Sequence, residues 1–261
     1  MPTKLTPDKP QSTDSSESNK AIYGTYEVTP IARALTPYKQ KFGIPRQPQL
    51  ADKVIGQIEL IEPYADPLAI DGLQQVSHIW VLFLFHQIDE TRCRQLRVRP
   101  PRLGGNKKLG VFASRSTHRP NRIGQSLLEI DRIEGSSIYV RGIDLLDQTP
   151  IIDIKPYLPY VERPEKCHNH IAADSPPTIE VTWHARANQQ IYQCQHKNLD
   201  PQSIQAMINQ CLAQDPRPAY SELDCQRVYG MRFDSFDIRF QYLSDELVQV
   251  VDLVMAADVD Q

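Results

Sequence analysis

The stretch HIWVLFLFHQI, residues 78–88, carries the strongest strand signal of the chain. From Ile79 to Phe85, β-branched, leucine and aromatic residues follow one another without a polar residue, a composition typical of β-strands. Because the run is continuous rather than alternating, it predicts a strand that is buried on both faces. It is the longest apolar run in the chain, and it is far shorter than the ~18 residues that a membrane-spanning helix needs.

Shorter strand signals lie on both sides of this segment, separated by turns that contain Pro or Gly. They cover residues 26–34, 54–61, 110–113, 125–133 and 137–146. No amphipathic helix of more than two turns lies between them, so helical crossovers between parallel strands are not expected. The sequence therefore predicts a mainly β protein whose first part is an antiparallel sheet or small barrel. A Rossmann fold is not expected, because no Gly-x-Gly-x-x-Gly follows a strand.

Composition divides the chain into four parts. Residues 1–20 contain almost nothing apolar and are predicted to be a disordered tail, followed by the β-barrel over 21–165. Residues 166–177 are predicted to be a linker, since prolines interrupt regular structure from Pro156 to Pro177. Beyond it, strand signals surround a helix that begins at Asp200-Pro201, an N-cap followed by proline. Residues 178–261 are therefore predicted to form a small α+β lobe.

Cysteine usage and the N-terminus indicate a reducing compartment. The five cysteines include no Cys-x-x-Cys pair, which argues against a disulfide framework. The N-terminus lacks the basic-then-apolar pattern of a signal peptide, so a cytoplasmic protein is expected. The only metal-like cluster, Cys167 to His170, lies in the predicted linker without a second ligand pair, so we expect no metal site.

The charge distribution points to an anionic partner. Residues 1–160 hold 21 Lys and Arg against 17 Asp and Glu, whereas residues 161–261 hold 8 against 15. Within the first part, residues 91–128 contain ten Lys and Arg and no Asp or Glu. A solvated surface normally mixes both signs, and arginine suits phosphate and carboxylate groups. We therefore predict a nucleic-acid partner for this acid-free stretch.

Several loops combine polar side chains with residues that restrict or free the backbone. The stretch GVFASRSTHRPNRIG, residues 110–124, places three arginines among hydroxyl and amide groups between two strand signals. PRQP at 45–48 and RPPRLGG at 99–105 each hold arginine beside proline, and His86-Gln87 closes the apolar strand. DLLD at 144–147 closes another strand with two carboxylates. Polar groups at strand ends are well placed to face a binding site.

These stretches resemble one family. TPYKQKFGIPRQP, HIWVLFLFHQ, RPPRLGGNKKLGVFASRSTHRPNRIGQSLLEI, DLLDQTPIIDIKPYLPY and AQDPRPAY are similar, in this order, to the TsaA-like family of bacterial TrmO proteins. The resemblance runs from about residue 25 to the C-terminus and is densest up to residue 160. The family usually has proline where this chain has Arg122, so this position departs from the pattern and adds a charge.

The resemblance implies a methyltransferase that uses S-adenosylmethionine and has a β-barrel fold distinct from Rossmann-like methyltransferases. The implied substrate is N6 of N6-threonylcarbamoyladenosine at position 37 of tRNA, beside the anticodon. A homodimer without a metal is also implied. By the family's binding pattern, the methyl donor would be held by Pro45, Arg46, Gln47, His86, Gln87, Arg115, Gln125, Asp144, Leu145, Leu146 and Asp147.

The residue types fit these roles. Arg115 or Arg46 suits the donor carboxylate, and Asp144 or Asp147 suits the ribose hydroxyls or the sulfonium, with DLLD main-chain groups at the adenine. A general base would assist the poorly nucleophilic acceptor nitrogen, and Asp144, Asp147 and His86 all remain candidates.

Other cations are expected to hold the RNA. Arg119 and Arg122 are candidates for the threonine carboxylate, and Arg92, Arg94 and Arg97 for phosphates. In DPRPAY, residues 215–220, Arg217 and Tyr220 are predicted to contact the substrate, with a packed helix terminator as the alternative.

Two other functions remain compatible with the sequence. A non-catalytic RNA-binding module needs the basic stretch but not the carboxylates and polar strand ends. A methyltransferase for a small-molecule acceptor needs the donor site but not the long acid-free stretch. Binding of S-adenosylmethionine separates the first from an enzyme, and methylation of tRNA separates the second.

Overall fold

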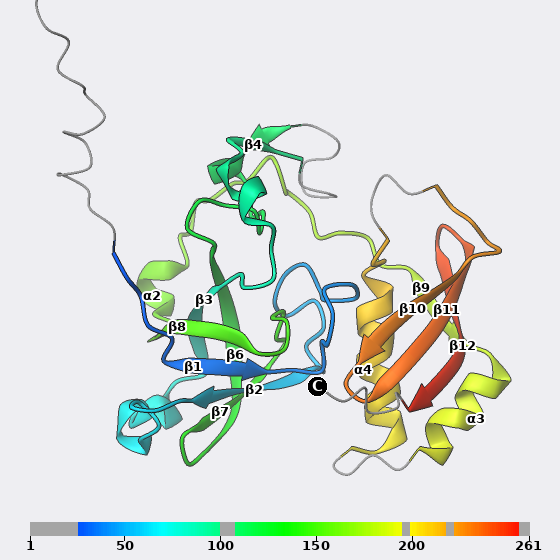
Figure 1. Cartoon of the computed structure of the whole chain (residues 1–261), viewed down its shortest axis with the longest axis horizontal. Helices are drawn as coiled ribbons and strands as arrows, with labels where there is room; N and C mark the ends of the chain where they lie inside the picture. The colour runs from blue at the N-terminus through cyan, green and yellow to red at the C-terminus, as the bar shows by residue number, and fades with distance from the viewer. Residues whose placement is uncertain (1–25, 100–107, 195–198, 218–221, 256–261) are drawn as a thin grey trace, which may run out of the picture.

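The computed structural model describes residues 26–99, 108–194, 199–217 and 222–255, which form a barrel and a second sheet with two helices beside it (Figure 1). Six strands close the barrel in the order β1-β2-β7-β6-β3-β8, and every pair is antiparallel. Their bounds are β1 Ala32–Leu35, β2 Ile55–Leu60, β3 His78–Leu84, β6 Ile123–Glu134, β7 Ser137–Arg141 and β8 Thr149–Pro156. The predicted antiparallel, mainly β fold is thereby confirmed.

Strand β3 points the side chains of only one of its faces into the barrel. Ile79, Val81 and Phe83 are buried inside, whereas Trp80 and Leu82 face outward and are half-buried. The prediction that both faces are buried was wrong, because a barrel wall has a single inner face and little covers its outside here. Trp80 is partly covered by the short helix α2, Pro159–Glu162, and its indole Nε1 donates to Glu162 at 3.0 Å.

Strand boundaries differ from the predictions where a turn or a proline intervenes. Strand β8 was not predicted, because Pro150 and Pro156 obscure its pattern, although both lie near its ends where a missing N–H costs little. The strand predicted at 110–113 is a two-residue strand, β5 Leu109–Gly110, followed by the 3-10 turn η4 Val111–Ala113. The strand predicted at 26–34 begins only at Ala32, and the one at 137–146 ends at Arg141.

Short 3-10 helices lie in two connections between the barrel strands. Between β2 and β3 lie η1 Pro67–Ile70 and η2 Leu73–Gln75. Between β3 and β6 the chain leaves the barrel through η3 Glu90–Arg94 and the strand β4 Arg97–Val98, which pairs with β5. No helix connects the strands of the barrel in the described part of this region, as predicted.

The C-terminal part is an α+β unit, as predicted. Its sheet has the order β10-β11-β12-β9, with β9 parallel to β12 and the other pairs antiparallel. The helix predicted after Asp200 is α4, and the Asp200 carboxylate caps it by accepting from Ser203 N at 2.9 Å. The elements are β9 Glu180–Trp183, α3 Ala185–Gln193, α4 Pro201–Ala213, β10 Val228–Phe233, β11 Phe236–Ser244 and β12 Leu247–Met255.

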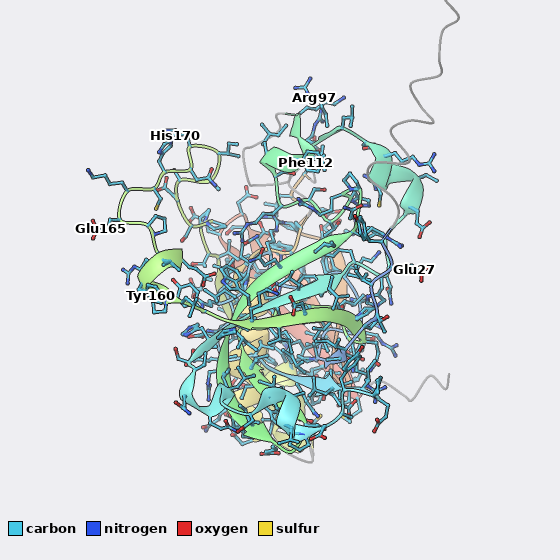
Figure 2. All side chains as sticks on the ribbon, turned by 90° about the vertical axis from the view of Figure 1, so that its left-hand side faces the viewer. Glu27, Arg97, Phe112, Tyr160, Glu165 and His170 are labelled. Carbon is cyan, nitrogen blue, oxygen red and sulfur yellow. The ribbon has the colours of Figure 1, made fainter. Side chains whose placement is uncertain are left out.

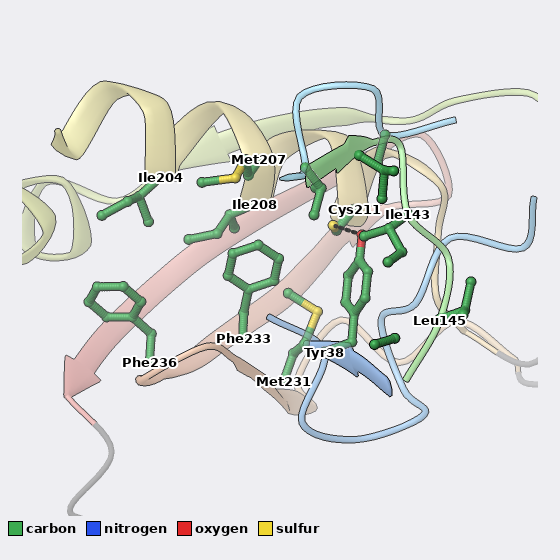
Figure 3. Close-up of a cluster of buried hydrophobic side chains, with 14 of the residues drawn as sticks. Tyr38, Ile143, Leu145, Ile204, Met207, Ile208, Cys211, Met231, Phe233 and Phe236 are labelled. Carbon is green, nitrogen blue, oxygen red and sulfur yellow. Dashed lines mark hydrogen bonds between the residues drawn. The ribbon is translucent and has the colours of Figure 1, made fainter. Parts of the chain in front are cut away.

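The two parts share one continuous hydrophobic core. Tyr38, in the loop after β1, is buried and forms a bridge with Phe233 of β10. Its hydroxyl lies 3.7 Å from Cys211 Sγ on α4 (Figure 3). Burial raises the pKa of Tyr38 and raises the pKa of Cys211 to about 12, so both groups stay protonated at neutral pH. The lobe therefore packs directly on the loop that connects β1 and β2.

Gly43 allows that loop to approach the lobe closely. Its φ is +91°, and a Cβ at this position would lie 2.1 Å from Met231 Sδ. Met231 is buried among the core side chains shown in Figure 3, so it has little room to move away. Any side chain at position 43 would therefore separate the loop from the lobe or force Met231 out of its place.

We expect Gly43→Ala to lower the free energy of unfolding by about 2–5 kcal/mol, from the positive φ and the overlap with Met231. Gly72→Ala is the matched control, because Gly72 has φ +89° but no atom within 4 Å of an added Cβ. The control should lose only about 1–2 kcal/mol. Urea denaturation measures both, and equal losses would show that packing against Met231 contributes nothing.

Candidate functional site

Three connections between barrel strands lie at the same end of the barrel. Strands β1, β3 and β7 end there, and β2, β6 and β8 begin there, because neighbouring strands are antiparallel. The connections span residues 36–54, 85–122 and 142–148. Almost all positions predicted to bind a small molecule lie on them, which is why segments a hundred residues apart in sequence meet at one end of the barrel.

The first and third connections contact each other through their backbones. Gln49 N donates to Gly142 O at 3.2 Å, and Gly142 N donates to Val54 O at 2.9 Å. Gly142 has φ +67°, and a Cβ there would come within 2.8 Å of Gln49 N, so this approach requires glycine. The first and third connections are thus held together by main-chain contacts at Gly142.

The second connection meets the first through Arg115, whose Nη1 donates to Gln47 Oε1. The hydroxyls around Arg115 fold its own loop: Ser114 Oγ donates to Val111 O at 2.9 Å, and Ser116 Oγ accepts from His118 N at 3.2 Å. Arg119 Nη1 donates to the carbonyls of Ser114 and Ser116, at 3.2 and 3.4 Å. The crowded polar residues of this stretch therefore fix a compact loop that presents Arg115, and Arg119 is partly used to hold it.

Asp144 is the most unusual carboxylate of the site. It is only partly exposed, its Oδ1 accepts from Ser126 Oγ at 2.6 Å, and Arg115 lies close enough to stabilise its charge. Burial raises the pKa of Asp144 to about 6, and the Ser126 hydrogen bond and Arg115 oppose this shift. Asp144 can therefore change protonation near neutral pH. The sequence analysis missed Ser126, because a single serine inside an apolar strand carries no local signal.

Asp147 has a structural task. Its Oδ1 accepts from Thr36 N at 2.9 Å, and its Oδ2 pairs with Lys39 Nζ at 2.8 Å. The Leu145 side chain lies in the core, and its carbonyl accepts from Thr36 Oγ1 at 3.0 Å. The Leu146 carbonyl accepts from Thr149, so each of the four residues in DLLD has a polar group that is bonded within the protein.

His86 and Gln87 follow directly after β3. His86 Nδ1 lies 3.5 Å from Thr149 Oγ1, and burial together with Lys41 lowers its pKa, so the imidazole is neutral at pH 7. Gln87 is exposed. Gln125 is exposed on the outer face of β6, opposite to the inward-facing Ser126, so the two neighbours point to different sides of the barrel wall.

Comparison with known proteins shows the family of this chain. The family described as tRNA-methyltransferase O N-terminal domain matches residues 33–163, and the TrmO C-terminal domain matches residues 176–256. The chain belongs to the TrmO family.

Two relatives and one solved structure describe this membership further. A tRNA (adenine(37)-N6)-methyltransferase of Escherichia coli is 38% identical over 83% of this chain and 93% of its own length. An S-adenosyl-L-methionine-binding protein of Archaeoglobus fulgidus is 34% identical over 57% of this chain and 99% of its own. A crystal structure of TrmO from Pseudomonas aeruginosa has a TM-score of 0.75 at 39% identity, covering 88% of this chain and 99% of that one.

Arg122 has contacts at both ends of the second connection. Its φ is +55°, a value that a proline ring cannot adopt. Its Nη1 pairs with Glu90 at 2.5 Å, and its carbonyl accepts from Phe85 N at 2.8 Å. The ion pair with Glu90 and the backbone hydrogen bond with Phe85 thus join the two ends of the second connection.

The predicted role of Arg217 differs from what the structure shows. Its side chain is buried, pairs with Asp215 through Nε at 2.9 Å, and lies 4.1 Å above the ring of Tyr242. Asp245 takes a further contact from Nη1 at 3.3 Å. Arg217 therefore holds the loop after α4, which fits the alternative prediction of a packed helix terminator. Its carbonyl accepts from Arg46 Nη2 at 3.3 Å. Tyr220 lies outside the described residues.

The remaining predicted RNA contacts are on the surface. Arg92, Arg94 and Arg97 are exposed on η3 and β4. Among the residues that the structure describes, no group of three or more His, Cys, Asp or Glu side chains is arranged to hold a metal ion. In the same residues, no helix is long and apolar enough to cross a membrane.

The raised pKa of Asp144 predicts a pH-dependent stability. Between pH 3.8 and about pH 6 the folded protein binds more protons at Asp144 than the unfolded chain, so stability falls as the pH rises. Asp144→Asn removes this loss, and we expect the variant to be more stable at pH 7 by up to about 3 kcal/mol.

Thermal unfolding across this pH range measures the effect. Asp147→Asn is the control of opposite sign, because it weakens the pair with Lys39 and should lower stability at pH 7. A constant difference between wild type and Asp144→Asn at every pH would contradict the assigned titration.

Proposed function

We propose that this protein transfers a methyl group from S-adenosylmethionine to N6 of adenosine 37 in tRNA, with N6-threonylcarbamoyladenosine as the acceptor nucleoside. The names of the relatives support the reaction and the donor. The observation that carries the proposal is the meeting of Arg115, Gln47 and Asp144 at one barrel end of a TrmO-family chain. The threonylcarbamoyl group rests on the resemblance of the sequence motifs alone.

The residues at the barrel end fit the methyl donor. When bound, S-adenosylmethionine supplies a methyl group on a positively charged sulfur. Arg115 is exposed, and its guanidinium suits the carboxylate of the donor. Asp144 is a partly buried carboxylate that suits a positive charge or a pair of hydroxyls, whereas Asp147 is already occupied by Thr36 and Lys39. Pro45, Arg46 and Gln47 lie on the connection that Arg115 contacts through Gln47.

Asp144 is also the base that we propose. A proton must leave the acceptor nitrogen as the new bond forms, and a carboxylate with a pKa of about 6 is ionised at pH 7 yet basic enough to accept it. Ser126 fixes the orientation of this carboxylate through Oδ1. His86 is neutral at pH 7 and is the second candidate, and Asp147 is the third.

The exposed arginines supply the RNA-binding surface of the proposal. Arg92, Arg94 and Arg97 would hold phosphates of the anticodon loop. Arg119 and Arg122 would hold the threonine carboxylate, beside the bonds that they already make to Ser114 O and Glu90. The proposal further includes a homodimer in the cytoplasm, a catalytic barrel over 21–165, a linker over 166–177 and an accessory lobe over 178–261. The family resemblance supports the dimer, and the sequence composition supports the rest.

The test is nucleoside mass spectrometry of tRNA from a strain that lacks this protein. We expect N6-threonylcarbamoyladenosine without its extra methyl group, and restoration of the methyl group by the wild-type protein. Arg115→Lys keeps the charge but loses the planar fork, so donor affinity measured by calorimetry should fall by roughly 1–3 kcal/mol. A protein that binds RNA but not S-adenosylmethionine would contradict the proposed enzyme and would indicate a non-catalytic RNA-binding module.

Replacing Arg92, Arg94 and Arg97 together by Gln should raise KM for tRNA and flatten its salt dependence, because fewer counterions are released on binding. Donor affinity should stay unchanged, since none of these three arginines, on η3 and β4, is among the residues proposed to hold the donor. Arg186→Gln is the control, as it removes an exposed charge from α3 in the second sheet. An unchanged salt slope in the triple variant would make these arginines ordinary surface residues.

A further inference from the structure

The excursion between β3 and β6 has a small core of its own. Cys93, Val98 and Val111 are buried in it, and they are separate from the continuous core of the barrel and lobe. We call η3, β4, β5 and η4, residues 90–98 and 109–113, the basic hairpin. It stands out from one end of the molecule (Figure 1). A segment with its own apolar anchors can hold a defined surface away from the barrel.

Two large apolar side chains of the basic hairpin face solvent. Phe112 is 77% exposed and Leu96 is 76% exposed. Val111 N donates to Leu96 O at 2.9 Å, which places the two segments side by side. Exposing a phenylalanine to this extent leaves most of its apolar area in water, and the neighbouring Val111 shows that the same turn can bury a side chain.

The turn that carries Phe112 is held firmly. Ser114 N and Ser114 Oγ both donate to Val111 O, at 3.3 and 2.9 Å. The carbonyl of Ser114 in turn accepts from Arg119. Arg115 follows Ser114 directly and lies three residues after Phe112. Arg115 contacts Gln47 on the connection between β1 and β2. Phe112 is thus presented by a fixed turn next to the proposed reaction site.

The charges around Phe112 indicate which kind of partner would contact this surface. Arg92, Arg94 and Arg97 are exposed on the same hairpin, and Arg97 and Phe112 lie at the same end of the molecule (Figure 2). A second copy docked through this surface about a two-fold axis would bring arginines against arginines. An unpaired nucleobase offers a flat π-face for the ring, and its phosphates complement the arginines.

We infer that Phe112 is a stacking platform for an unpaired base of the tRNA anticodon loop, next to the adenosine that is methylated. This inference rests on the proposed function. It adds a residue that positions the acceptor RNA through base stacking, beside the phosphate contacts of the arginines. It also explains the excess of exposed apolar surface in an otherwise basic segment.

The experiment uses the full-length protein and an anticodon stem-loop RNA that carries N6-threonylcarbamoyladenosine at the target position. A 2-aminopurine beside it reports stacking, because stacking quenches its fluorescence. Phe112→Leu keeps an apolar side chain without a ring, and Phe112→Trp keeps a ring. Tyr160→Leu is the control, because Tyr160 is 81% exposed on α2, away from the hairpin (Figure 2). Donor affinity, RNA affinity and oligomeric state are measured for each variant.

We expect Phe112→Leu to weaken RNA binding about 10-fold and to lose the quenching, whereas Phe112→Trp and Tyr160→Leu keep both. Donor affinity and circular dichroism should stay as in the wild type. Unchanged RNA affinity in Phe112→Leu would overturn the inference. A change in oligomeric state as the main effect of Phe112→Leu would overturn it too, because it would assign Phe112 to a contact between two copies of the protein. A wild type that binds and quenches the RNA without methylating it would contradict the proposed function alone.

Discussion

Antiparallel closure of the barrel is the constraint on which the rest of the structure depends. In a closed antiparallel sheet every second connection emerges at the same end, and no strand edge remains open. Here one end carries the hairpin between β6 and β7 and the connection 61–77 between β2 and β3, whereas the other end carries the connections 36–54, 85–122 and 142–148. Polar groups that would be costly inside a sheet are thereby gathered where they remain accessible, which is the usual position of binding residues on a rigid scaffold.

The second sheet completes this arrangement from outside the barrel. Tyr38 and Gly43 lie on the connection between β1 and β2, and their contacts with Cys211, Phe233 and Met231 fix that connection from the side of the lobe. Because residues 45–47 belong to the same connection, the lobe affects the proposed donor site without supplying a side chain to the cluster of Arg115 and Asp144. A role of this kind explains why an acidic unit accompanies a domain that is proposed to bind RNA.

Arg217, which is buried, and Asp144, which is partly buried, show how the surroundings decide the task of a charged residue. The guanidinium of Arg217 is surrounded by Asp215, Asp245 and the ring of Tyr242, so its charge is compensated within the protein and it serves the loop that it holds. Asp144 receives a hydrogen bond from Ser126 but no ion pair at contact distance in the described structure, and burial raises its pKa. A compensated charge stabilises one conformation, whereas an undercompensated one is available for chemistry.

The sequence by itself determined the fold class, the α+β character of the second part, the capped start of α4 and the stretch of one charge sign. These properties depend on local composition and periodicity, which a single segment carries alone. Tertiary structure decided the outward face of β3, the existence of β8, the partnership of Ser126 with Asp144, and the burial of Arg217. Each of these depends on what a distant segment places next to the residue: Thr36 meets Asp147 across 111 positions, and Arg46 meets the carbonyl of Arg217 across 171. A local pattern states that a side chain is polar or apolar, but only the packed chain supplies the partner that makes it a cap, a structural ion pair or a reactive group.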